Sequence, residues 1–129
     1  MGQQQLLLII LGTIIVGLAI AVGLSMFTAQ SVESNKDAII HDLNNLAAEA
    51  HQYRIRPTSM DGGARSYEGF TISSNMESND NATYTCSTTE DEVTFTAVST
   101  QDPANTIVAE IGTNGKFVQS AWSYTGEFL

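Results

Sequence analysis

The feature that most constrains this chain is an apolar run of 24 residues that begins at the sixth residue. From Leu6 to Ala29 the chain reads LLLIILGTIIVGLAIAVGLSMFTA, without one charged side chain. At about 1.5 Å per helical residue, this run is long enough to cross the ~30 Å hydrocarbon layer of a membrane. A removable secretory signal would instead have an apolar stretch of only ~7 to 15 residues behind a basic start, and MGQQQ carries no Lys or Arg. Residues 1–30 therefore predict a helix that enters a membrane.

The flanks of this run differ from those of a lone membrane anchor. Anchors usually carry Lys, Arg, Trp or Tyr at their ends, whereas here three glutamines precede the run and residues 30–33 read QSVE. We therefore expect the helix to leave the lipid and to pack against other helices. Small residues, which let helices approach closely, occur throughout the run. They are Gly12, Gly17, Ala19, Ala21, Gly23 and Ser25.

A second pattern, an apolar stripe at helical spacing, continues from this segment over residues 31–56. Its members, separated by seven, four, three, four and three residues, are Val32, Ile39, Leu43, Leu46, Ala50 and Tyr53. Arg54 and Arg56 favour a helix C-terminus and Pro57 stops the helix there. The two patterns predict one helix, apolar all round in its first half and amphipathic in its second. Such a helix is roughly 80 Å long, so we expect half of it to protrude.

The rest of the chain, residues 57–129, has the pattern of an antiparallel β domain. Segments rich in Thr, Val, Tyr and Phe with partial alternation predict four strands, and Asn114–Gly115 predicts a tight hairpin turn. The stretch Ser66–Ser73 is either an edge strand or a loop. The predicted strands are Ala82–Thr88, Glu92–Ser99, Thr106–Ile111 and Lys116–Ser123.

The expected fold is α+β: the long N-terminal helix packs its amphipathic half on one face of an antiparallel meander of about four strands. The helix contributes the stripe residues Ile39, Leu43, Leu46 and Ala50. The opposite face of the sheet then carries Thr and Ser toward water. The sheet residues expected under the helix are Val93, Phe95, Ile107, Ile111 and Phe117.

The charge of the chain and its cysteine content disfavour one class of function and exclude one kind of cross-link. Fourteen acidic residues against five basic ones give a net charge of −9, which disfavours nucleic-acid binding. A single cysteine, Cys86, cannot form an intrachain disulfide, and its place in the TYTC pattern predicts a small buried hydrophobe.

No residue pattern predicts catalysis, a metal or a cofactor, so we expect a protein that is not an enzyme. The two histidines, His41 and His51, point about 80° apart on a helix and have no third ligand at metal spacing. The polar stretch 75–81 lacks calcium-loop spacing and is more typical of a solvated loop. Asn81-Ala82-Thr83 matches the N-glycosylation sequon, which makes Asn81 a candidate modification site.

The charge-free run from the sixth residue, the helix of about fifty residues and the following sheet together resemble the type IV pilin superfamily of bacteria. The sequence-specific part of the resemblance lies in residues 1–25 and near Tyr53. The resemblance implies a fold in which N-terminal helices leave the inner membrane and bundle into a filament core. The residues it assigns to subunit assembly are Met1, Gln5, Leu6, Leu7, Ile10, Ile14, Leu18 and Val22.

The chain departs from the family pattern at several points. The family usually has Glu at the fifth mature position, paired with a neighbour's N-terminal amine, where this chain has Gln5; an amide still accepts a hydrogen bond but carries no charge. The helix-breaking Pro is absent, with Val22 in that region, so Gly12, Gly17 and Gly23 are the candidates for local helix melting on assembly.

Two further departures concern the ends of the chain. The family's basic leader does not precede Met1, so either the chain is already mature or this branch does without that cleavage. The C-terminal cysteine pair is also missing, which leaves an apolar group to anchor that end, and we expect this group to pack within its own subunit. Its members are Trp122, Tyr124, Phe128 and Leu129.

The function that the resemblance implies is structural: a fimbrial subunit that polymerises with itself into an extracellular, helical pilus for adhesion, motility or surface attachment. Its expected partners are copies of itself, the inner membrane before assembly and the pilus assembly machinery. Two alternatives stay open. One is a pseudopilin or minor pilin of a secretion or assembly system, and the other is a single-pass membrane-anchored β binding domain.

Overall fold

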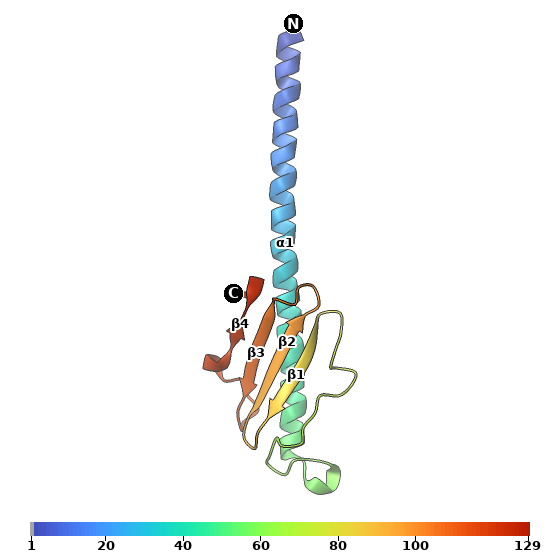
Figure 1. Ribbon diagram of the computed structural model, residues 1–129, viewed down its shortest axis with the longest axis vertical. Coiled ribbons are helices and arrows are strands. Elements are labelled where there is room, and N and C mark those ends of the chain that lie inside the picture. The colour runs from blue at the N-terminus through green and yellow to red at the C-terminus, as the bar shows by residue number, and fades with distance from the viewer. Residues whose placement is uncertain (1) are drawn as a thin grey trace. The chain divides into compact units, whose positions relative to one another are not determined.

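The computed structural model describes residues 2–129, which form two compact units, residues 2–33 and 34–129. A single helix, α1 (Gly2–Ile55), makes up the first unit and supplies the helical layer of the second (Figure 1). In the second unit this helix packs on a four-stranded antiparallel sheet. The predicted α+β fold class is confirmed.

The sheet is a meander in which strands pair in chain order. β1 (Ala82–Thr88), β2 (Val93–Ser99), β3 (Thr106–Ile111) and β4 (Ser123–Tyr124) lie in the order β1-β2-β3-β4. Cys86 is opposite Phe95, and Phe95 is opposite Ala109, which fixes the register. The first and third strands have the predicted bounds, and β2 begins one residue later than predicted.

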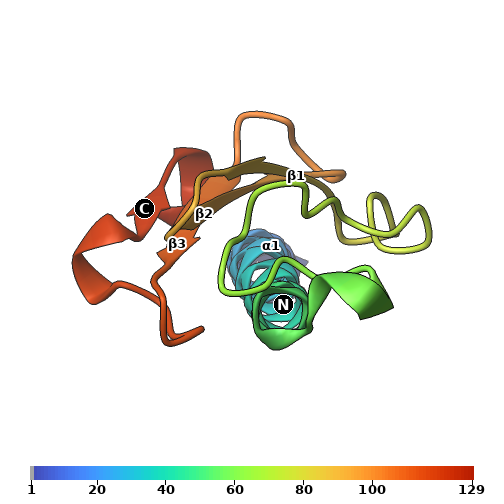
Figure 2. The same ribbon diagram turned by 90° about the horizontal axis from the view of Figure 1, so that it is seen from below.

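The core lies between one face of the sheet and the amphipathic part of α1 (Figure 2). The four stripe residues expected to cover the sheet are buried, and Ala47 joins them. Along β2 every second residue is buried, because successive side chains of a strand point to opposite faces. The other face is more open and is dominated by threonines, as predicted. The sheet residues buried against the helix are Ala82, Tyr84, Val93, Phe95, Ala97, Ile107, Ala109 and Ile111.

The prediction for the fourth strand is wrong. Residues 116–123 do not form a strand: Phe117 makes one isolated bridge to Ile111, Gln119–Ala121 is a short 3-10 helix, and β4 has only two residues. Phe117 is half-buried rather than in the core, because its ring packs on Trp122 at a centroid distance of 4.8 Å. The predicted turn is present, with Gly115 at φ +74°.

The segment between α1 and β1 is a loop, which decides the alternative left open for residues 66–73. After the 3-10 helix Thr58–Met60 the chain has no strand until Ala82. Three apolar side chains of this loop are nonetheless buried, because the loop fills the space beside the helix and sheet: Phe70 contacts the rings of Tyr53 and Phe95, at 5.6 and 6.5 Å. The three side chains are Tyr67, Phe70 and Ile72.

The C-terminal anchor is shorter than predicted. Phe128 is buried within its own unit, as expected, whereas Leu129 is 92% exposed and anchors nothing. Trp122 and Tyr124 are half-buried and stack on each other at 6.0 Å, with the Lys36 ammonium 4.5 Å from the Tyr124 ring. Three of the four residues thus pack inside the subunit.

Candidate functional site

The first candidate site is the surface of the apolar unit. Every large apolar side chain from Leu6 to Phe27 is between 54% and 72% exposed. The helix is long and apolar enough to cross a membrane, and none of its most apolar window is buried. Such a surface needs an apolar environment, either lipid or other helices, because exposed apolar area of this extent is unfavourable in water.

Two of the three hydroxyl side chains inside this run are hydrogen-bonded to their own helix. The Thr13 hydroxyl donates to the Ile9 carbonyl at 2.8 Å, and the Thr28 hydroxyl donates to the Leu24 carbonyl at 3.0 Å. In an apolar medium an unsatisfied donor would be costly, so these bonds let the run enter lipid or a helical bundle without a penalty at those positions.

Bulky and small residues are distributed around the helix along this run. At about 100° per residue, the bulky residues assigned to assembly between Leu6 and Val22 fall on one broad face. Gly12 and Gly23 are eleven residues apart and so point within about 20° of each other, away from that face, with Ala19 between them. Gly17 and Ala21 fall on the bulky face, and Ile9, Val16 and Ile20 lie beside Gly12 and Gly23, so each face mixes small and bulky residues. Gln5 is exposed, and Met1 lies outside the described residues.

The three glycines proposed to melt on assembly are helical here. Helix α1 is continuous through Gly12, Gly17 and Gly23, and a Cβ placed at any of them would meet nothing within 4 Å. Glycine in a helix interior lowers helix stability by up to ~1 kcal/mol relative to alanine, without any packing reason for it within this chain. Melting in the assembled state stays a prediction.

The candidate glycosylation residue, Asn81, belongs to a polar network between helix and sheet. Its Nδ2 donates to Asp42 at 3.3 Å, and its carbonyl accepts from Asn35 Nδ2 at 3.1 Å. Asn35, buried in the helix, also accepts from the Ser99 hydroxyl at 2.7 Å. Asn81 is therefore half-buried, and the nitrogen that would carry a glycan is hydrogen-bonded. Glycosylation there would require this bond to break.

Asp42 is the acceptor at the centre of this network. It accepts hydrogen bonds from the Tyr84 hydroxyl at 2.5 Å and from Asn79 Nδ2 at 2.9 Å, in addition to Asn81. Burial by itself raises the pKa of Asp42, but the three hydrogen bonds outweigh it and hold the pKa below its ordinary value. Burial, together with the Asp42 charge, raises the pKa of Tyr84. The ionised Asp42 thus ties the helix to β1.

Sequence reasoning missed this network, although a signal for it was present. The apolar stripe skips from Val32 to Ile39, and Asn35 occupies the intervening position on the same face. A polar side chain on a buried stripe must find a partner, so it predicts a buried hydrogen bond. The identity of the partners, Asn81 and Ser99, depends on long-range packing and has no local signature.

Cys86 and the two histidines differ in how exposed their side chains are. Cys86 is a free thiol that is only half-buried, and burial raises its pKa. His41 is exposed, and His51 packs beside the turn at Gly115. Among residues 2–129 no three His, Cys, Asp or Glu side chains are grouped to hold a metal ion.

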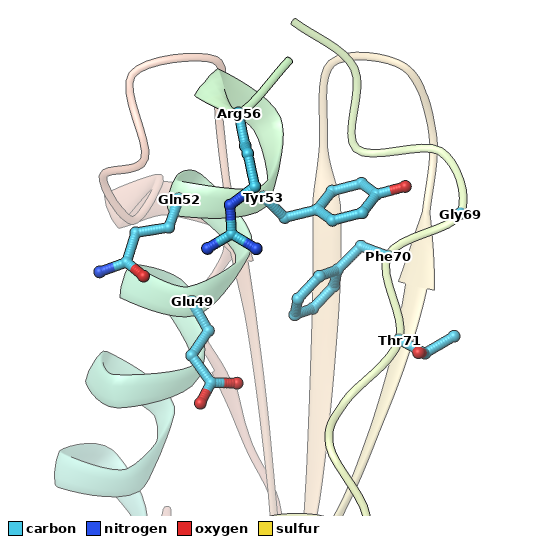
Figure 3. Close-up of a pocket in the computed structure, with 7 residues that line it drawn as sticks. All are labelled: Glu49, Gln52, Tyr53, Arg56, Gly69, Phe70 and Thr71. Carbon is cyan, nitrogen blue, oxygen red and sulfur yellow. The ribbon is translucent and has the colours of Figure 1, made fainter. Parts of the chain in front are cut away.

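A groove of about 300 Å³ lies between the C-terminal end of α1 and the loop that follows it (Figure 3). One wall is the helix face with Glu49, Gln52, Tyr53 and Arg56, and the other is residues 69–71. The rings of Tyr53 and Phe70 lie side by side between the walls, and the Tyr53 hydroxyl donates to the Glu68 carbonyl at 2.9 Å. The groove combines an aromatic floor with one charge of each sign.

No protein-family model, no curated protein and no solved structure matches this chain.

Proposed function

We propose that this chain is the structural subunit of an extracellular filament of the type IV pilus kind. The subunit is held in the inner membrane by residues 6–29 until an assembly machine moves it into the filament, and it serves adhesion, motility or attachment of the cell. The observation that carries the proposal is the continuous, charge-free apolar helix with its side chains exposed, joined to a small acidic β unit.

The flanks of the helix favour a segment that leaves the membrane over a permanent anchor. A permanent anchor gains from aromatic or basic residues at the lipid headgroups, and the glutamines at positions 3–5 and 30 supply neither. Glutamine costs less than a charged residue when a helix slides out of lipid into a bundle, because its amide is neutral and finds hydrogen-bond partners among neighbouring helices.

The small residues of the apolar helix also support association with copies of itself. In lipid, helices associate through close packing rather than through the hydrophobic effect, and small residues allow that packing. Gly12, Ala19 and Gly23 lie close together on the helix surface and leave room for a bulky side chain of a neighbour. A Leu or Ile of an identical helix can fill that room, and such a contact between two different surfaces repeats into an open helical array.

The free energy of assembly depends on where the apolar helix was before it entered the array. Transfer of apolar area from water into a bundle is worth ~25 cal/mol per Å², but here most of the area moves from lipid, which is already apolar. The net gain per subunit is therefore set by packing quality and by the assembly machinery. Gln5 fits this scheme as a neutral docking group, because its amide oxygen accepts a hydrogen bond from a neighbour's N-terminal ammonium.

A charge inside the apolar run tests the proposal. Ile14→Lys places an ammonium at the middle of the run, where it costs ~3 kcal/mol in lipid and a comparable amount in a dry bundle, whereas Gln30→Lys places the same charge at the polar boundary. We expect Gln30→Lys cells to shed filaments at the wild-type level and Ile14→Lys cells to shed almost none, measured by electron microscopy and immunoblot of the sheared surface fraction. Wild-type cells with no filaments, and the protein only in the membrane, would instead support an anchored domain or a pseudopilin.

A further inference from the structure

Most cations of the β unit lie at one end of the sheet, whereas both ends carry carboxylates. The pairings Ala82 with Ser99 and Val98 with Thr106 bring the connections before β1, between β2 and β3, and after β4 to one end of the sheet. The helix reaches that end at Asn35, which bonds to Asn81 and Ser99. The parts of these connections that lie at that end, residues 75–81, 100–105 and 125–129, carry acidic residues and no Lys or Arg. The one cation beside them is Lys36 of the helix, over the Tyr124 ring. We call the exposed carboxylates there the acidic end: Asp80, Asp102 and Glu127.

The opposite end carries most of the cations. Helix α1 ends beside the β1–β2 turn, where Arg54 lies 3.8 Å from Asp91. Directly after it, the segment 56–65, here called the arginine loop, exposes two cations, Arg56 and Arg65, and one carboxylate, Asp61. Among residues 2–129 the Arg54–Asp91 contact is the one ion pair, so these two exposed guanidinium groups have no carboxylate partner.

The arginine loop is held in an unusual and well-bonded backbone conformation. Asp61, Ala64 and Arg65 all have positive φ, at 58°, 48° and 75°, a region that side-chain-bearing residues rarely occupy. Backbone hydrogen bonds hold it there: the Ala64 N–H donates to the Arg56 carbonyl at 3.0 Å and the Arg65 N–H to the Arg54 carbonyl at 2.6 Å. Such conformations persist where the surrounding structure holds them. Here the hydrogen bonds fix the position from which Arg65 projects.

One unit cannot bring its own two ends together. Asn35 and Ile55 are 20 residues apart on one helix, which places the ends about 30 Å from each other. That distance is beyond the Debye length of ~8 Å at physiological salt, so the unpaired arginines and the carboxylates of the acidic end do not neutralise one another within the unit. When a second copy is stacked end to end, the unpaired arginines of one copy face the carboxylates of the other.

We propose that the arginine loop of one copy docks on the acidic end of the next copy. This contact joins two different surfaces of identical chains, so it repeats in one direction and propagates a filament instead of closing a dimer. The β1–β2 turn beside the arginine loop carries Glu90, Asp91 and Glu92, which repel an acidic partner. The attraction is therefore confined to the loop side of that end, and it sets the orientation in which copies meet.

The inference rests on the proposed filament and names which β-unit surfaces meet in it. Two full-length variants test it: a loop variant, Arg56→Glu with Arg65→Glu, and an end variant, Asp80→Lys with Asp102→Lys and Glu127→Lys. Each alone places like charges opposite each other, and we expect about tenfold fewer filaments in the sheared fraction than for wild type. Co-expression of the two variants pairs each altered surface with its complement, and we expect it to restore filaments in which both variants are present.

Two controls separate this contact from other effects. Lys116→Glu reverses an exposed cation at the same end but outside the loop, and it changes the net charge as much as Arg65→Glu alone does. We expect Arg65→Glu to lower filament yield and Lys116→Glu to leave it unchanged. Tryptophan fluorescence of the detergent-solubilised variants checks that each is folded.

The outcomes distinguish the inference from the function on which it rests. Wild-type filaments whose yield is insensitive to the loop and end variants, or a loss that co-expression fails to restore, would overturn the docking contact and leave the filament standing. An equal loss for Lys116→Glu and Arg65→Glu would attribute the effect to net charge and also overturn it. A wild-type chain that forms no filaments would overturn both.

Discussion

Removing the hydroxyl of Tyr84 tests how the helix is tied to the sheet. The Tyr84 hydroxyl donates to Asp42 at 2.5 Å, and its ring is buried on the helix-facing side of β1. A hydrogen bond to a charged acceptor contributes about 1.5 to 3 kcal/mol, and Asp42 keeps its other two donors when this one is lost. Because the carboxylate is partly exposed and water can replace the lost donor, we expect Tyr84→Phe to lower the free energy of unfolding by about 1.5 kcal/mol.

Neutralising the acceptor should cost more. Asp42→Asn keeps the shape of the side chain but turns one oxygen into an N–H donor that faces the donors of Asn79 and Asn81. We expect a loss of about 2 to 3 kcal/mol, and a double variant with Tyr84→Phe should lose less than the sum, because the two residues share a bond. The exposed Asp37→Asn is the matched control and should change stability by less than about 0.5 kcal/mol.

The contribution of Asp42 also has a defined pH dependence. Its pKa is lower in the folded protein than the ordinary 3.8 of the unfolded chain, so the stabilisation is fully present above that value and is lost as the pH falls through the folded-state pKa. The difference between wild type and Asp42→Asn should therefore be constant from pH 5 to 7 and shrink below about pH 4. Urea unfolding of the full chain in mild detergent, followed by the fluorescence of its single tryptophan, measures it. A Tyr84→Phe variant as stable as wild type, or a difference that grows in acid, would refute the reasoning.

Of three further predictions, two use the same unfolding assay and the third uses alkylation of Cys86. Leu43→Ala opens a cavity at a fully buried position and should cost about 2 to 5 kcal/mol. Gly115→Ala forces a side chain into φ +74°, with its Cβ 2.5 Å from the His51 ring, and should cost at least about 1 kcal/mol, whereas Gly112→Ala, whose nearest neighbour lies at 3.8 Å, should cost less. Burial raises the pKa of Cys86, so iodoacetamide at pH 8 should alkylate the folded chain more slowly than the urea-unfolded chain, with the difference shrinking as the pH rises; equal rates would contradict this.

Local periodicity was enough to predict most of the fold. The spacing of Ile39, Leu43, Leu46 and Ala50 identified the buried helix face, and alternation identified the first three strands nearly to the residue. These elements are predictable because each buries one face, and the period of the apolar residues then follows from the geometry of the helix or strand.

The failures occurred where contacts between particular side chains override the local pattern. Residues 116–123 alternate like a strand, but Phe117 finds Trp122 as a partner and the chain turns away from β3 after a single bridge. Phe70 lies in the stretch predicted as an edge strand or a loop, and its contacts with Phe95 and Tyr53 place it in the core. Tyr53 and Phe95 are 17 and 25 residues away from Phe70, so no local pattern specifies these contacts.

The candidate site also has one part that the sequence predicts and one part that it does not. The composition of residues 6–29 predicts a membrane or bundle environment, because no other environment accepts so much exposed apolar area. The arginine loop has no such signature: the positive φ angles at Ala64 and Arg65 depend on hydrogen bonds to the end of α1, which exist only in the folded chain.

Helical reconstruction by electron cryo-microscopy of filaments sheared from the producing cells tests the central claim most directly. We predict a thin fibre with the helices of residues 6–29 packed along its axis, the β units outside, and Gln5 in contact with a neighbouring subunit. A map in which these helices lie outside the core, or a surface fraction without fibres while the protein stays in detergent-extracted membranes, would contradict the account.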